Sequence, residues 1–525
     1  MRLPVLATAL LLVASGALAQ PQASPPQQPG AAHPDQTSPR GAAAQAGKLA
    51  DADVATAPIP EQKKLTRHSV TIGGRPIAYD ATAGTLTIRD DDGKPTASVF
   101  YVAYTTGGAR RPVTFFYNGG PGSPTMWLHL GSFGPVRVKT ASPDVTAPPP
   151  FDIGPNPDSL IDKTDMVFID AIGAGLSRPV GDAKGKDFWG VDQDADAFAR
   201  AIIRYITVNS RWNSPKVIFG ESYGTLRSGA LAWQLQDRGV QLNGVVLLSS
   251  ILNYGVRDAG FDTIYLTYLP SYAATAWYHN RVANRPADLA TYLTEVRAWT
   301  RGPYATALAK GQDIPAAEED QIARQMSAYT GLSVPFLKEN NLRVDLSRFR
   351  KELLRDQRRT VGRLDSRFLG IDADAGGESP EDDPASTAIT GAYMAATNAW
   401  IRDDLGYQTD MVYRPSAGPA IQVWDWHHTP PGSRRPANTP DTALDLAATM
   451  RVNPHLKVYS LNGYYDMATP FAGTEYDLSH MMLEPELRGN VRYAYYPSGH
   501  MVYLHDPSLK QMKADLAKFY DEVAR

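Results

Sequence analysis

The segment Gly220-Glu221-Ser222-Tyr223-Gly224 has the G-x-S-x-G spacing of a serine nucleophile at a sharp turn. The two glycines permit the backbone to turn from a strand into a helix, and this turn exposes the serine hydroxyl above the sheet. The flanking sequence agrees, because residues 216–219 form a β-type apolar run and residues 225–236 read as a helix. The sequence therefore predicts Ser222 as a catalytic nucleophile rather than an ordinary turn serine.

A serine hydroxyl attacks only when a base takes its proton, and a third group must orient that base. Asp466 follows an apolar run and a Gly-containing loop, and His500 directly follows a second such loop at residues 495–499. The order serine, acid, histidine is that of the α/β-hydrolases, so we predict a triad of Ser222, Asp466 and His500. The simpler alternative for either loop residue is a turn-capping aspartate or a surface histidine. Other candidates are His505 for the base, and Asp410 and Asp506 for the acid.

Acyl chemistry also needs N–H donors for the oxyanion that forms during attack. Residues 118–122, Asn-Gly-Gly-Pro-Gly, directly follow the apolar run 113–117 and form a loop suited to this purpose. We expect the backbone N–H groups of Gly120 and Tyr223 to form the oxyanion hole. The same loop lacks the Gly-Lys-Ser/Thr ending of a phosphate-binding loop, so the nucleotide-binding alternative is not favoured.

The elements that must position these loops begin with antiparallel strands and continue as a parallel sheet. The runs 68–72, 75–79, 85–89 and 98–104 are separated by turn residues, which indicates hairpins. Short apolar runs at 113–117, 166–170, 217–219 and 245–248 then alternate with helical stretches such as 194–205, which is typical of buried parallel strands. Two further strands are expected at 458–461 and 492–496, followed by a helix at about 508–523.

The fold class predicted from this pattern is α/β, an α/β-hydrolase with a mostly parallel sheet flanked by helices and an inserted, mainly helical cap. The catalytic domain would comprise residues 64–256 and 444–525, and the cap residues 257–443, because strands on both sides of that segment complete one sheet. Two independent domains are the alternative. His427 and His428 lie with Trp424 and Trp426 in this segment, and we expect them to line or pack the cap.

The N-terminus has the features of an export signal. Arg2 precedes an apolar run at residues 3–14, and Ala17-Leu18-Ala19 matches a signal-peptidase site, so residues 1–19 are a predicted signal peptide. An uncleaved anchor is the alternative. Residues 20–63 are rich in Pro, Gln and Ala and are expected to be a disordered linker. We predict an exported, periplasmic or secreted protein without an integral membrane segment, since no later run of about 20 apolar residues follows.

Composition excludes several classes of site. The chain of 525 residues contains no cysteine, which excludes a cysteine nucleophile, a thiolate zinc site and a cysteine-held iron–sulfur cluster. A net charge of −3 argues against a nucleic-acid partner. The acidic segment 372–383 lacks the residue order of a twelve-residue calcium loop and is expected to be a solvated loop. We therefore predict neither a metal nor a cofactor.

Four ordered motifs resemble the serine carboxypeptidase family. They are the loop 118–122 with Gly134-Pro135 behind it, Asn156-Pro157 with Ser159, the segment 220–224, and Gly499-His500-Met501-Val502. The resemblance implies an α/β-hydrolase fold with a helical cap and release of C-terminal residues from peptides, often at acidic pH. It also implies that Asn118 and Glu221 hold the carboxylate of the peptide substrate. A carboxyl that faces a carboxylate must share a proton with it, which gives a physical reason for the acid preference.

The chain departs from the family pattern at three positions of the Gly-rich loop region. A further glutamate of the family falls at Ser132, the usual tryptophan is Phe116, and the usual cysteine is Ser123. These changes leave the triad and the oxyanion hole intact but weaken the carboxylate clamp. Because the triad, the oxyanion loop and the family motifs are retained, the predicted function is a serine carboxypeptidase that releases C-terminal residues through an acyl-enzyme on Ser222. The alternatives are an esterase or acyltransferase with the same triad, and a catalytically inactive binding protein.

Overall fold

The structure, a computed structural model, describes residues 56–108, 110–258 and 260–524. The predicted signal peptide 1–19 and most of the predicted linker 20–63 lie outside the described residues. No helix in the described part of the chain combines the length and the apolar character that a membrane span requires.

A ten-stranded sheet forms the centre of the molecule, with the order β1-β2-β3-β7-β4-β9-β10-β13-β14 and a short strand β8 beside β3. The pairs from β1 to β7 are antiparallel, and those from β7 to β14 are parallel. The strands are β1 (Lys63–Ile72), β2 (Arg75–Arg89), β3 (Pro95–Thr105), β4 (Val113–Tyr117), β7 (Asp165–Ile169), β8 (Arg178–Pro179), β9 (Lys216–Ser222), β10 (Gly244–Ser250), β13 (Lys457–Gly463) and β14 (Val491–Tyr496). The predicted mostly parallel sheet is confirmed.

Strand β2 differs from the expectation of two separate strands at 75–79 and 85–89. Residues 80–84 continue the strand and pair with β1 on one side and β3 on the other. Their sequence, Asp-Ala-Thr-Ala-Gly, looks like a turn because its side chains are small. Ala81 and Ala83 are fully buried instead, so the small side chains serve close packing between neighbouring elements.

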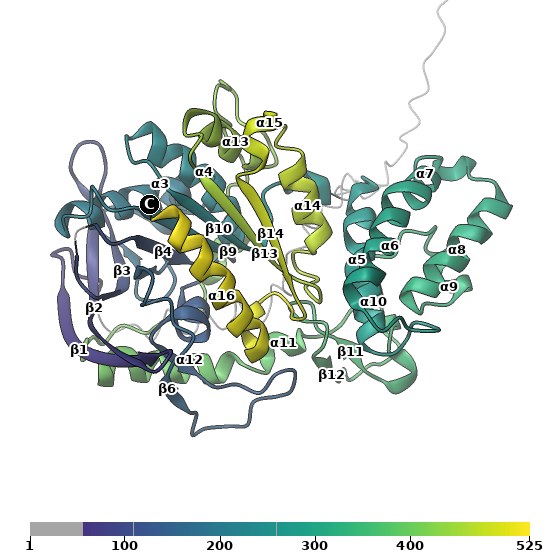
Figure 1. Cartoon of the computed structure of the whole chain (residues 1–525), viewed down its shortest axis with the longest axis horizontal. Coiled ribbons are helices and arrows are strands. Elements are labelled where there is room, and N and C mark those ends of the chain that lie inside the picture. Colours follow the sequence, from purple (N-terminus) through teal and green to yellow (C-terminus); the bar gives the residue numbers. More distant parts are fainter. Residues whose placement is uncertain (1–55, 109, 259, 525) are drawn as a thin grey trace, which may run out of the picture.

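Helices cover both faces of the sheet (Figure 1). On one face α3 (Val191–Val208), α4 (Tyr223–Asp237) and α13 (Ala443–Val452) pack against alternate side chains of β9 and β10. On the other face α12 (Thr390–Ala399) and α16 (Asp506–Val523) pack against the remaining ones. Because the central strands are buried on both faces, their sequences are nearly continuous apolar runs.

The segment between β10 and α13 is inserted and mainly helical, and it has two parts. Helices α5 to α10 form a lobe with its own apolar core beside the β13–β14 edge of the sheet (Figure 1). The part containing α11 and α12 returns along the sheet and contributes to the hydrolase core. The helices of the segment are α5 (Thr263–Tyr278), α6 (Leu289–Trp299), α7 (Ala305–Leu308), α8 (Ala316–Thr330), α9 (Val334–Glu339), α10 (Leu346–Glu352), α11 (Pro384–Thr387) and α12.

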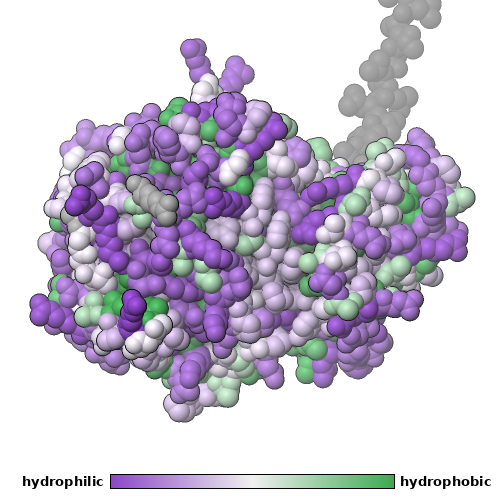
Figure 2. Space-filling model, viewed as in Figure 1, coloured by the Kyte–Doolittle hydropathy of each residue, from purple (hydrophilic) through white to green (hydrophobic). Residues whose placement is uncertain are grey.

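Shorter elements connect these layers. They are β5 (Val136–Val138) paired with β6 (Ile153–Pro155), β11 (Thr360–Val361) paired with β12 (Leu369–Gly370), α2 (Met126–Leu128), the π-helix η1 (His129–Phe133), α14 (Phe471–Ser479), α15 (Pro485–Arg488) and the 3-10 turn η9 (Val502–Leu504). The face of the molecule shown in Figure 2 is mostly hydrophilic, with hydrophobic residues in small scattered patches.

Candidate active site

Ser222 is the last residue of β9, and helix α4 begins at the next residue. Its backbone has φ 61° and ψ −132°, a conformation that a residue with a side chain rarely adopts. Gly220 permits this turn, because a Cβ atom there would lie 2.3 Å from the carbonyl oxygen of Gly224. A strained serine between a strand and a helix is the geometry expected for a nucleophile elbow.

Asp466 and His500 form a buried pair. The Nδ1 atom of His500 lies 2.8 Å from Oδ2 of Asp466, and His500 is 3% exposed. Asp466 is held in turn by the backbone N–H groups of Ala468 and Thr469 at 2.8 and 2.9 Å and by the Thr469 hydroxyl at 2.7 Å. An imidazole whose Nδ1–H faces a carboxylate has Nε2 available to accept a proton from a serine.

The charge on His500 is stabilised by its neighbours. Burial opposes a charged ring, but the attraction of Asp466, their hydrogen bond and the charge of Glu221 raise the pKa of His500 above its ordinary value. The imidazolium that forms when a serine gives up its proton is therefore stabilised in this pocket.

Parallel pairing brings the three candidate triad residues to one edge of the sheet. Strands β9, β10, β13 and β14 are neighbours, so the loops at their carboxyl ends meet there. Ser222 pairs in register with Ser250 of β10. The preceding residue, Ser249, donates from its hydroxyl to the carbonyl of His500 at 2.6 Å, and its own carbonyl accepts from Thr469 at 2.9 Å.

The alternative acids and bases have other surroundings. His505 lies at the start of α16 with Nδ1 2.7 Å from the Ser508 hydroxyl. Asp506 pairs with Arg137 at the surface, and Asp410 is exposed. Neither aspartate is a partner of His500.

The predicted oxyanion loop lies against the nucleophile elbow. A Cβ atom on Gly119 would lie 2.4 Å from the backbone nitrogen of Tyr223 and 2.8 Å from the carbonyl of Glu221, so only glycine permits this approach. Gly120 has φ +106°, in the region that favours glycine. The backbone segments that carry the predicted donors, Gly120 and Tyr223, are thus brought next to each other.

Asn118 and Glu221, predicted as a carboxylate clamp, lie together and are joined by a residue that the sequence analysis missed. The hydroxyl of Tyr503 donates to the two carboxylate oxygens of Glu221 at 3.0 and 3.3 Å, and the Asn118 side chain also bonds Glu221. Burial raises the pKa of Glu221 to about 7, against the opposing effects of His500, Tyr503 and Asn118. The position of Tyr503 shortly after His500 is the only sequence signal for its role.

The family position of a further glutamate is occupied differently. Ser132 lies in η1, is fully buried and donates from its hydroxyl to the carbonyl of Leu128. The Ser132 hydroxyl therefore bonds the backbone of its own helical segment. Phe116, at the family's tryptophan position, stacks between Phe168 and Phe219 in the core at centroid distances of 4.7 and 4.9 Å.

Trp424 and Trp426, in the segment that was expected to line or pack the cap, lie beside the nucleophile elbow. Trp424 and Trp426 meet the ring of Tyr223 edge to face at 5.4 and 6.1 Å. His428 is buried between Asp192 of α3 and Asp445 of α13, with its ring nitrogens 2.6 and 2.8 Å from their carboxylates. His428 thus fastens the segment to the hydrolase helices.

The described residues contain no group of three or more His, Cys, Asp or Glu side chains arranged to hold a metal ion. In the acidic segment 372–383, Asp372 differs from the expected solvated residue. Its carboxylate is 5% exposed and pairs with the buried ammonium of Lys351 at 2.5 Å. The ion pair anchors the loop to α10.

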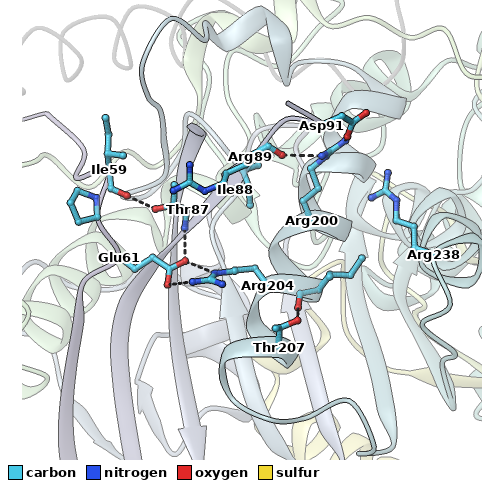
Figure 3. A pocket seen from close by; sticks show the side chains of 12 residues that line it. Ile59, Glu61, Thr87, Ile88, Arg89, Asp91, Arg200, Arg204, Thr207 and Arg238 are labelled. Carbon is cyan, nitrogen blue, oxygen red and sulfur yellow. Dashed lines mark hydrogen bonds and ion pairs between the residues drawn. The ribbon is translucent and has the colours of Figure 1, made fainter. Parts of the chain in front are cut away.

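A pocket of about 800 Å³ lies away from the candidate triad, between β2, α3 and residues 59–61 (Figure 3). Its guanidinium groups already have partners, since Arg204 binds Glu61 at 2.7 Å and Arg200 binds Asp91 at 2.9 Å. The contacts of Glu61 with Arg204 and with the backbone of Thr87 attach the first described residues to the sheet. We interpret this pocket as structural rather than catalytic.

Comparison with known proteins agrees with this geometry. The model of the serine carboxypeptidase family matches residues 75–282, which include the Gly-rich loop and the nucleophile elbow. The chain resembles the serine carboxypeptidases. The resemblance expected from the sequence motifs is thus confirmed, and with the fold it supports a hydrolase function. No curated protein is significantly similar to the chain in sequence.

Similarity to solved structures was also found. The carboxypeptidase Kex1(delta)p from Saccharomyces cerevisiae, which processes prohormones, is 15% identical, with a TM-score of 0.51 over 84% of this chain and 91% of that one. A thermophilic esterase from Thermogutta terrifontis is 12% identical, with a TM-score of 0.34 over 84% and 99% of the chains. Proline iminopeptidase from Mycobacterium smegmatis is also 12% identical, with a TM-score of 0.34 over 87% and 99%. The first of these likenesses supports the fold alone, and the other two have TM-scores too low to support an argument.

Proposed function

We propose that this protein is a serine carboxypeptidase that releases C-terminal residues from peptides through an acyl-enzyme on Ser222. The observation that carries the proposal is the buried Asp466–His500 pair on the sheet edge that presents the strained Ser222. A Gly-rich loop in contact with the elbow supplies candidate oxyanion donors. A binding protein without catalysis would have no use for this combination.

The reaction follows from the roles of these groups. His500 takes the proton of the Ser222 hydroxyl as the oxygen attacks the peptide carbonyl, and Asp466 holds the imidazole and stabilises its charge. The backbone N–H groups of Gly120 and Tyr223 stabilise the negative oxygen. His500 then gives its proton to the leaving amine, and water repeats the sequence to release the acyl group.

Preference for the C-terminus rests on Glu221 and Asn118. A protonated Glu221 carboxyl can donate a hydrogen bond to the substrate carboxylate, whereas two carboxylates would repel each other. With a pKa raised to about 7, Glu221 keeps its proton through the acid range. The preference for peptides with a free C-terminus is therefore expected to be largest below about pH 7.

The test compares N-blocked dipeptides with a free or an amidated C-terminus between about pH 4 and 8, using wild type and Ser222→Ala. We expect Ser222-dependent cleavage that is much faster for the free-carboxylate peptides than for the amidated ones, and this preference should fall as the pH rises through about 7. Absence of Ser222-dependent turnover of every substrate would contradict the assignment of the triad.

The second candidate is an esterase or acyltransferase with the same triad. The observation in its favour is Ser132, which leaves the clamp with one carboxyl group fewer than the family pattern. Equal cleavage of amidated peptides or esters in the same experiment would favour this function.

We also propose that the protein is exported, on the basis of the signal-peptide pattern at residues 1–19. Determination of the N-terminal residue of the protein recovered outside the cytoplasm tests this, and Gln20 is the expected first residue.

A further inference from the structure

Tyr503 is a buried tyrosine that contacts Glu221 and was not among the predicted residues of the triad or the clamp. It lies in η9, three residues after His500, and its side chain is fully buried. Its hydroxyl reaches both oxygens of the Glu221 carboxyl at 3.0 and 3.3 Å and also bonds the Asn118 side chain. A hydroxyl that bridges two members of the clamp fixes the direction in which the Glu221 carboxyl points.

The ring of Tyr503 packs closely against the backbone of η1. A Cβ atom on Gly131 would lie 2.7 Å from a ring carbon of Tyr503 and 2.2 Å from the hydroxyl of Tyr393, so both rings press on the backbone of η1. Arg137 binds the carbonyls of Gly131 and Tyr503 at 2.9 and 2.8 Å. The backbone beside the family's further glutamate position, at Ser132, is thus tied to Tyr503.

Several titratable groups of the described residues act on Glu221 or respond to its charge. His500 and Asp466 act on it from the loops after β14 and β13, and Tyr503 acts from η9. In α12, burial and the charge of Glu221 raise the pKa of Tyr393, and the charge of Arg137 opposes this shift. Of these titratable groups, Tyr503 hydrogen-bonds Glu221, as does the side-chain amide of Asn118.

We propose that Tyr503 is a positioning residue of the substrate-carboxylate site, where its hydroxyl orients Glu221 and sets the upper pH limit for cleavage of peptides with a free C-terminus. In the family pattern a second carboxyl group would stand at position 132, and two adjacent carboxyls hold a proton by mutual repulsion. A tyrosine hydroxyl acts in the opposite direction, because it donates to the ionised form of Glu221 and stabilises it. The inference rests on the proposed carboxypeptidase function.

Removal of the Tyr503 hydroxyl is therefore expected to raise the pKa of Glu221. In Tyr503→Phe the ionised form of Glu221 loses a donor, so Glu221 keeps its proton to higher pH. Loss of one hydrogen bond to the charged form of a carboxyl raises its pKa by about one unit. Cleavage of free-carboxylate peptides should extend upward in pH by about that amount, while KM at acid pH rises because Glu221 is less well oriented.

The experiment measures kcat/KM against pH for one peptide with a free and with an amidated C-terminus, in wild type, Tyr503→Phe and Tyr496→Phe. Tyr496 is the matched control, since it is a buried tyrosine that donates to another carboxylate, Asp515, at 3.1 Å. The proposal requires that the upper limit moves for Tyr503→Phe alone and for the free-carboxylate peptide alone. The proposal is overturned if the upper pH limit of kcat/KM does not move in Tyr503→Phe, or if it moves equally for both peptides.

A double-mutant cycle between Tyr503→Phe and Glu221→Gln, followed by urea unfolding at pH 5 and pH 8, gives a readout that does not depend on activity. Stability loss from Tyr503→Phe should be larger at pH 8 than at pH 5 and should lose this pH dependence in the Glu221→Gln background. Equal losses at both pH values overturn the link between Tyr503 and Glu221. If wild type shows no preference for free carboxylates, the proposed function fails even where the cycle shows coupling.

Discussion

Glu221 is the residue whose ionisation most directly connects the geometry of the candidate site to a measurement. It is 2% exposed, and its burial raises its pKa from an ordinary value of 4.5 to about 7. Folding thus favours the protonated form, so the contribution of Glu221 to stability is complete below about pH 4.5 and is lost as the pH rises through 7.

Glu221→Gln should remove this loss, because glutamine has no charge to bury. The free energy of unfolding of the variant, relative to wild type, should rise by about 3 kcal/mol between pH 5 and pH 8. Urea unfolding at the two pH values measures it. Parallel pH dependences of the two proteins would mean that Glu221 titrates at its ordinary pKa.

Asp466→Asn should lower kcat by roughly 10⁴-fold without unfolding the protein, because the amide cannot hold and charge-stabilise His500 as a carboxylate does. Asp506→Asn is a matched control nearby, since its carboxylate is exposed and pairs with Arg137 at the surface. Turnover of the acyl substrate by both variants is the measurement, and a wild-type rate in Asp466→Asn would exclude this aspartate as the acid.

At the residue scale, the sequence predicted the groups that carry local motifs. Ser222 and the loop 118–122 are recognised from glycine spacing, and Asp466 and His500 from their loops and order. The sequence did not predict the contacts of Tyr503 and His428. Their partners, Glu221 for Tyr503 and Asp192 and Asp445 for His428, lie far away in the sequence. Contacts of this kind follow from the folded chain and leave no short pattern.

The loop between β11 and β12 connects the inserted segment to the candidate triad. The carbonyl of Leu364 accepts from the backbone N–H of His500 at 2.6 Å, and the carbonyl of Arg363 accepts from Met467 at 3.1 Å. Ser366 binds the carbonyl of Tyr465 at 3.0 Å, and its own carbonyl lies 2.7 Å from His279, which follows α5. One loop therefore connects the acid loop, the histidine loop and the helical lobe.

Arg367 and Asp365 hold this loop in shape. The two side chains are 4% and 2% exposed and pair at 2.5 Å, and Arg367 also reaches the Ser498 hydroxyl and the Pro497 carbonyl before His500. Arg367→Leu leaves Asp365 buried without its cation, which should reduce stability by about 3–5 kcal/mol. It should also lower kcat, since the loop that presents His500 loses two contacts.

Arg348→Leu is the control for this prediction, because Arg348 of α10 binds the exposed Glu378 and the amide of Asn340 rather than a buried carboxylate, and the ion pair should contribute less than about 1 kcal/mol. Urea unfolding and the steady-state rate of both variants provide the comparison. Adding Asp365→Asn to Arg367→Leu should recover part of the stability by removing the unpaired charge. Equal effects of the two arginine variants would contradict a role for the buried pair.

At the scale of elements, strands were predicted better than the inserted segment. The strand at 113–117 was predicted with its observed bounds, because a strand buried on both faces has an unbroken apolar run. The inserted segment was recognised as helical, but its division into a lobe around α5–α10 and a part with α12 that completes the sheet's core depends on tertiary packing. Helical periodicity shows which side of a helix is apolar without showing what covers it.

Over the whole molecule, several buried groups respond to pH in the same direction. Burial raises the pKa of Asp441 and of Asp477 to about 6, and that of Glu221 to about 7. Each of these carboxyls contributes stability that is present at acid pH and is lost as the pH rises through its folded pKa. The combined contribution of these carboxyls should therefore decline between about pH 5 and pH 8, against an opposite contribution from the buried His129, whose pKa burial lowers to about 3.

His428 extends this trend to alkaline pH. Burial opposes its charge, but the hydrogen bonds and charges of Asp192 and Asp445 raise the pKa of His428 from 6.5 to about 9. Because the folded pKa lies above the ordinary value, this contribution is complete below about pH 6.5 and is lost as the pH rises through 9. Between these values the protein should lose roughly 2 kcal/mol through this single residue, which joins the inserted segment to α3 and α13.

His428→Gln tests that contribution by thermal unfolding at pH 6, 7.5 and 9. The variant should be less stable than wild type at pH 6, where the imidazolium lies between two carboxylates. The difference should shrink steadily toward pH 9, where the wild-type ring has lost much of its charge. His427→Gln is the matched control, since its ring is exposed and binds the exposed Asp425 on the same segment. A pH-independent difference for His428→Gln would show that the residue acts by packing alone, and the alkaline loss of stability would then have to come from the carboxyl groups.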